Sequence, residues 1–165
     1  MNILNLFEEE LDYEYQVTKK FIERFPEGKN DYKPHEKSTG LLHLASHIIE
    51  VFSWPQVMAN TEVLDLATGD HNPAKPETKE DLLQLLEKAY TDGKEALETM
   101  DENDLEKKWS LANDGNILAS WTKQGAIRHA LNQITHHRAQ LGVYYRLLDI
   151  PLPGSYGPSA DDNEF

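Results

Sequence analysis

Residues 126–148 form a segment in which apolar side chains recur at steps of three and four. The apolar positions are Ile127, Ala130, Ile134, Leu141, Tyr144 and Leu148. This spacing is typical of an amphipathic helix that faces a core, so the chain must pack at least one long helix against other elements. The missing step of the pattern is His137, and its neighbour His136 lies about 100° away around a helix. We therefore expect the ring of His137 to point inward.

A second segment, residues 41–54, has the same feature. Leu44, Val51 and Trp54 follow the helical spacing, and His47 lies in the gap between them. Two inward-facing histidines on two helices of a bundle can together provide ligands for a metal site. A single histidine in an apolar stripe is more often a core residue with one hydrogen-bond partner, so both interpretations stay open.

Composition narrows the classes of function. The chain has 165 residues, with 16 basic and 29 acidic side chains, so its formal net charge is −13. A surface this acidic repels phosphate backbones, which argues against nucleic-acid binding. The absence of cysteine excludes disulfides and thiolate metal sites, so a metal would need nitrogen and oxygen donors. Residues 1–12 lack the pattern of a signal peptide and no segment resembles a membrane span, so we expect a cytoplasmic protein without a membrane partner.

The pattern along the chain predicts one domain over residues 1–165. Helical spacing covers, approximately, residues 4–25, 38–60, 79–100 and 120–149. Pro55 predicts a kink just after Trp54, and Asp114-Gly115 is a turn signal that predicts a short ribbon within residues 109–119. The connection over residues 61–78 is long for a bundle. We therefore expect an all-α fold, a four-helix bundle with a long crossover between its second and third helices.

Several segments resemble one known family. Residues 136–144, His-His-Arg-Ala-Gln-Leu-Gly-Val-Tyr, are similar to the His-His-Arg-Gly-Gln-Leu helix of the DinB/YfiT-like metal-binding bundles. Residues 150–161 look like the ending of one branch of that family, and residues 34–38 and 44–48 resemble its loop and second helix. The resemblance covers nearly the whole chain. It implies a DinB-like four-helix bundle, often a homodimer, with a divalent metal held by three histidines.

The resemblance assigns the ligands by position. One comes from the second helix and two come from the fourth, four residues apart, so His47 would be the first ligand and His137 the last. The middle position is Gln133, which departs from the family pattern. A glutamine amide is a weaker ligand than imidazole for zinc or nickel, the metals that we expect, with manganese as a further option. Gln133 is one helical turn from His137 and can still face the same point.

Three other side chains are candidates to complete the donor set. His43 and Glu50 flank His47 on roughly the same face of its helix, and Glu50 is also a candidate catalytic base toward metal-bound water. His129 lies about 12 Å along the helix axis from His137, so an exposed histidine is its preferred interpretation. His35 and His71 lie in loops, and we expect both to face solvent.

Two residues close to His137 in the sequence are expected to have structural roles. We expect Arg138 to form a surface or interface ion pair. Gln140 is three residues past His137 and could support that ring with a hydrogen bond.

The resemblance suggests a divalent-metal-binding protein and, as one hypothesis, a metal-dependent transferase acting on a small thiol. A metal-dependent hydrolase is an alternative. A second alternative is a degenerate, non-catalytic member in which Gln133 has weakened metal binding. Composition and periodicity do not separate these hypotheses, so whether the protein is an enzyme, and which small molecule it takes, stay open.

Overall fold

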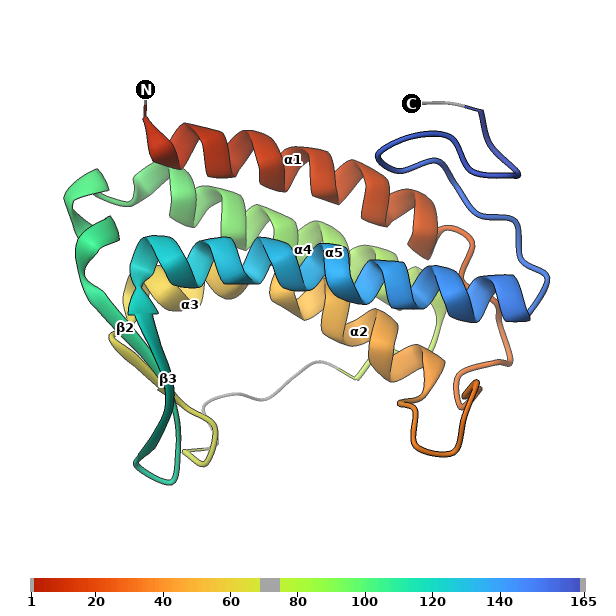
Figure 1. The fold of residues 1–165 in the computed structure, drawn as a ribbon, viewed down its shortest axis with the longest axis horizontal. Helices are drawn as coiled ribbons and strands as arrows, with labels where there is room; N and C mark the ends of the chain where they lie inside the picture. The colour runs from red at the N-terminus through yellow and green to blue at the C-terminus, as the bar shows by residue number, and fades with distance from the viewer. Residues whose placement is uncertain (1, 69–74, 164–165) are drawn as a thin grey trace.

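The computed structural model describes residues 2–68 and 75–163. Its elements are α1 (Ile3–Ile22), α2 (Leu41–Val51), α3 (Trp54–Asn60), β1 (Val63–Asp65), α4 (Lys79–Thr99), a 3-10 helix (Glu102–Glu106), β2 (Lys108–Asn113), β3 (Asn116–Thr122) and α5 (Lys123–Leu147). The long helix α1 lies beside both α4 and α5, and α2 and α3 pack against α4 and α5 (Figure 1). Among the described residues, no helix has both the length and the apolar character needed to cross a membrane.

The expected all-α four-helix bundle is wrong in two respects. The second predicted helix is two separate helices, because α2 ends at Val51 and α3 begins at Trp54. Pro55 has no N–H to donate, so it is accommodated in the first turn of a new helix instead of the interior of a continuous one. The described residues also contain a three-stranded sheet, in which β1 pairs parallel to β2 and β2 pairs antiparallel to β3. The molecule is therefore mostly helical with a small mixed sheet.

The hairpin of β2 and β3 projects at one end of the helical layers (Figure 1). Asp114 and Gly115 both have positive φ, at 50° and 74°, as a tight two-residue hairpin turn requires. The pairing register places Trp109 opposite Trp121. The chain passes from β3 directly into α5, whose first turn is capped by the Thr122 side chain. This direct connection fixes the hairpin relative to α5.

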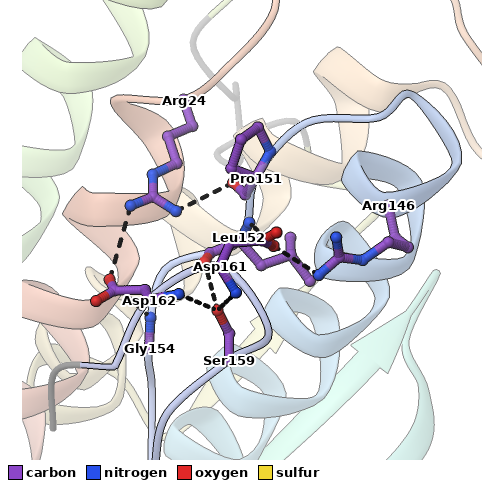
Figure 2. Close-up of polar contacts among 8 residues, drawn as sticks. All are labelled: Arg24, Arg146, Pro151, Leu152, Gly154, Ser159, Asp161 and Asp162. Carbon is purple, nitrogen blue, oxygen red and sulfur yellow. Dashed lines mark hydrogen bonds and ion pairs between the residues drawn. The ribbon is translucent and has the colours of Figure 1, made fainter.

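The residues after α5 fold back over α1 and α5 (Figure 1). Asp161 accepts a hydrogen bond from the Leu152 N–H at 2.9 Å and one from Arg146 at 2.7 Å. Asp162 lies 3.7 Å from the guanidinium of Arg24, and Figure 2 shows these contacts together. The tail is thus held by ion pairs to Arg24, in the turn after α1, and to Arg146, in the last turn of α5.

Candidate functional site

The rings of His47 and His137 lie next to each other. His47 comes from α2 and His137 from α5, two helices that pack together. The ring centroids are 4.7 Å apart and the ring planes meet at 77°. Both rings are partly exposed, so the pair lies at the edge of the core instead of within it. The helical spacing of each segment thus brings the two predicted histidines to one point.

Amide side chains of α5 surround His137. Its Nε2 atom lies 2.9 Å from Oε1 of Gln133, and its Nδ1 atom lies 3.0 Å from Oε1 of Gln140. The Gln140 amide also reaches the ring of His136 at 3.1 Å. Burial lowers the pKa of His137, and the neighbouring rings of His47 and His136 act in the same direction. His137 therefore favours the neutral form, which can bind a metal or accept a proton.

Glu50 brings a carboxylate close to the ring of His47. Its Oε2 atom lies 3.7 Å from Nδ1 of His47, one helical turn away on α2, and its side chain is 21% exposed. His43, one turn before His47, is exposed. No group of three His, Cys, Asp or Glu side chains is arranged to hold a metal ion within residues 2–68 and 75–163. The predicted donors thus comprise two imidazoles, one amide and a nearby carboxylate.

Other predicted residues lie elsewhere. His129 is half-buried instead of exposed, because its ring stacks on Trp121 with centroids 5.1 Å apart. His35 is exposed, as expected, and His71 lies outside the described residues. Arg138 does not form a surface pair. Its guanidinium is buried against the carboxylate of Glu14, with the two side chains 3% and 2% exposed.

An apolar cavity of about 380 Å³, which we call the aromatic pocket, adjoins His47 and Glu50. Its lining residues are His43, His47, Glu50, Trp54, Val57, Met58, Leu64, Leu66, Trp109, Leu111, Trp121, Ala126 and His129. The three tryptophans among them are all the tryptophans of the chain. Apolar clefts of this size with a few polar groups at one side are typical of small-molecule sites.

Sequence reasoning missed this pocket because its walls come from distant segments. Trp54 begins α3, whereas Trp109 and Trp121 lie on the two strands of the hairpin. One signal was present. The turn at Asp114-Gly115 implies a hairpin in which Trp109 and Trp121 oppose each other, and the structure has this pairing. The packing of that hairpin over α3 and α5 is not visible in the sequence.

Comparison with known proteins places the chain in a family. The model of the DinB family matches residues 1–164. The chain belongs to the DinB family. The DinB-like protein YjoA of Bacillus subtilis has the same fold, with a TM-score of 0.69 and 18% identity over 89% of this chain and 96% of that one. A DinB-like protein of Bacillus cereus also has this fold, with a TM-score of 0.68 and 19% identity over 90% of this chain and 94% of that one. No curated protein matches the sequence.

The arrangement in this DinB-family chain limits the chemistry that the site can perform. Two adjacent imidazoles can accept or donate a proton, and the carboxylate of Glu50 can do the same. Of these groups, His47 and Glu50 border a cavity whose walls are mainly apolar, where a bound molecule would lose contact with water. The site can therefore hold an apolar molecule with one polar end beside His47.

Proposed function

We propose that this protein binds a small organic molecule in the aromatic pocket, with the polar end of that molecule beside His47 and Glu50. The observation that carries the proposal is the cavity itself. It is large enough for a molecule of the size of a substituted aromatic ring, and three indole side chains line it. Buried contact with such side chains is a principal source of affinity for small ligands.

Intrinsic fluorescence provides a direct test. Because all three tryptophans line the pocket, the tryptophan emission of the protein reports on this pocket. We expect 2-phenylethanol to shift or quench the emission in a saturable manner, and calorimetry to give the same dissociation constant. Trp121→Leu removes one wall and should weaken binding several-fold. Leu118→Ala is the matched control, because Leu118 is 59% exposed on the same strand and does not line the pocket.

We propose divalent metal binding by His47 and His137 as a second candidate function. The contact between the two rings favours it, together with the lowered pKa of His137, since a ligating histidine must be neutral. Imidazole nitrogens and an amide oxygen are donors that zinc, nickel or manganese can accept, although an amide oxygen from Gln133 binds more weakly than a third imidazole. Bound there, such an ion would supply stabilisation of a thiolate or activation of water, as a transferase acting on a small thiol or a hydrolase requires.

In this second candidate function, each side chain near the two histidine rings has a defined role. His47 and His137 would hold the ion, and Gln133 would add an oxygen. Glu50 would take a proton from a thiol or water at the mouth of the pocket, because its carboxylate lies beside His47. If the protein fails to bind metal, we would infer that it is a non-catalytic member of the family in which metal binding has weakened.

Metal titration of the protein purified without an affinity tag tests this candidate. We expect weak binding of zinc and nickel, and Gln133→His should tighten it by at least about tenfold, or about 1.4 kcal/mol. Gln16→His is the control, because it adds an imidazole at an exposed position of α1. Equal affinity in the wild-type protein and in Gln133→His would show that residue 133 is not a ligand.

A further inference from the structure

A second cavity shares part of its wall with the aromatic pocket. It is a cleft of about 810 Å³, which we call the polar cleft, and its walls come mainly from residues 30–40, α2 and α4. Its polar lining includes Asp31, Lys33, Ser46, Ser53, Lys88 and Asp92. Three residues of α2 line both cavities, namely His43, His47 and Glu50. The two cavities therefore meet along one stretch of α2.

The helical spacing of α2 accounts for this shared wall. One row of side chains lines the polar cleft alone and consists of Leu42, Ser46 and Ile49. The next row around the helix, which we call the shared row, consists of His43, His47 and Glu50. In both rows the steps are of three and four residues, which places the members of each row on one strip of the helix surface. A molecule that crosses the shared row would thus pass from one cavity into the other.

The shared row is accessible, and the wall of the cleft is fixed. The side chains of His47 and Glu50 are 30% and 21% exposed, and His43 is exposed. Across the cleft, the carbonyl of Asn30 accepts a hydrogen bond from the N–H of Leu42 at 3.0 Å. The Asn30 side chain donates to the carbonyl of Glu77 at 3.0 Å. A wall held in this way needs little ordering when a ligand binds.

The two cavities differ in chemistry. Three lysines and three carboxylates are among the described residues that line the polar cleft, and Lys88 pairs with Asp92 there. The cleft thus offers both donors and acceptors of hydrogen bonds without an excess of charge of either sign. The walls of the aromatic pocket are mainly apolar and include all three indoles. The cavities therefore suit two chemically different halves of one molecule.

We propose that the ligand of this protein spans both cavities, with an aromatic end in the aromatic pocket and a polar tail in the polar cleft. The tail carries hydrogen-bonding groups and no net charge, and the junction of the two halves lies against His47. This inference rests on the proposed small-molecule function and adds the length and chemical class of the ligand.

Three neutral probes test the proposal. The short probe is 3-phenylpropionamide. The extended probe, 3-phenylpropionyl-glycyl-glycinamide, adds two peptide units, and acetyl-glycyl-glycinamide supplies the polar tail alone. We expect the extended probe to bind about tenfold tighter than the short one in calorimetry, because its added atoms make contacts in the cleft. The tail alone should bind most weakly, since it lacks the aromatic end.

A variant that fills the cleft separates the two cavities. Ser46→Tyr places a ring in the polar cleft, and Ser46 does not line the aromatic pocket. This variant should abolish the advantage of the extended probe while leaving the affinity for the short probe within about twofold, which also shows that the protein is folded. Gln84→Tyr is the matched control, because Gln84 is exposed on α4 and lines neither cavity.

The possible failures are distinguishable. Equal affinities for the short and extended probes in the wild-type protein would overturn the inference while the aromatic pocket remains a ligand site. An advantage of the extended probe that persists in Ser46→Tyr would also overturn it, because the tail would then lie outside the polar cleft. No binding of either aromatic probe would overturn both this inference and the proposed small-molecule function.

Discussion

Glu14 of α1 and Arg138 of α5 form an ion pair in which both side chains are almost completely buried. The guanidinium also donates to Thr18 at 3.1 Å and to the hydroxyl of Tyr156 at 3.3 Å, so its N–H groups have partners. Tyr156 in turn donates to the carboxylate of Glu14. Because Arg138 follows His137 directly, this pair fixes the part of α5 that presents His137 to α2.

Removal of one partner should be costly. We expect Arg138→Met to lower the free energy of unfolding by about 3–5 kcal/mol, because the carboxylate of Glu14 would stay buried without its cation. Addition of Glu14→Gln to this variant should recover part of the loss. Urea denaturation measures both. The control is Arg128→Met, which breaks the exposed pair of Arg128 with Glu10 and should cost less than about 1 kcal/mol. Similar losses in Arg138→Met and Arg128→Met would contradict this account of the buried pair.

At the scale of elements, α4 crosses the junction of α2 and α3 at very close range. A Cβ atom on Gly93 would lie 2.1 Å from the carbonyl oxygen of Phe52, the residue that follows α2. The break between α2 and α3 and the glycine in α4 therefore belong to one packing arrangement. Phe52 itself is fully buried at this contact.

Gly93→Ala should destabilise the protein, although alanine is the better helix former. The added methyl group meets backbone that cannot rotate away, so we expect a net loss of about 1–3 kcal/mol. Thermal and urea unfolding measure it, with Thr91→Ala at an exposed position of α4 as the control. A more stable Gly93→Ala protein would mean that α4 can move away from Phe52 at little cost.

Asp65, at the end of β1, connects the sheet to the turn of the hairpin. Its carboxylate accepts hydrogen bonds from the N–H groups of Asp114 at 2.9 Å and Gly115 at 2.7 Å. Asp65→Ala should therefore speed amide hydrogen exchange at Gly115 and weaken binding in the aromatic pocket, one wall of which is this hairpin. Hydrogen exchange observed by NMR checks this. Unchanged exchange at Gly115 would show that the turn holds its shape without Asp65.

The sequence predicted the long helices well and the sheet only in part. Helical spacing located α1, α4 and α5 to within a few residues, because each buries a continuous apolar stripe. The three residues of β1 have no local pattern, since that strand depends on its pairing with residues 110–112. The burial of Arg138 was equally invisible, because its partner Glu14 lies 124 positions earlier in the chain. The inward direction of His47 and His137 followed from periodicity, whereas the tryptophan walls beside them depend on packing between distant elements.

At the scale of the whole molecule, the C-terminal tail closes over α1 and α5 and carries Tyr156 to the buried pair. Arg146 and the N–H of Leu152 lower the pKa of Asp161 below its ordinary value of 3.8. At pH values between the lowered pKa of Asp161 and its ordinary pKa, the closed tail therefore binds fewer protons than a released tail does. Its stabilisation by Asp161 is complete above about pH 4 and is lost as the pH falls through the lowered pKa.

This linkage predicts acid release of the tail before the helices unfold. We expect the protection of the Leu152 amide against hydrogen exchange to stay constant from neutral pH to about pH 5 and to fall below about pH 4. Asp161→Asn should lower that protection at neutral pH, because the neutral amide cannot pair with Arg146, and it should remove the pH dependence. Glu27→Gln, on the loop after α1, is the control and should leave the protection of Leu152 and its pH dependence unchanged.

Since Tyr156 contacts Glu14 and Arg138, an open tail would also expose that pair to water, so α1 and α5 should lose stability in the same pH range. Full protection of Leu152 in the Asp161→Asn protein would show that the tail is held by its other contacts, such as the pair of Arg24 with Asp162.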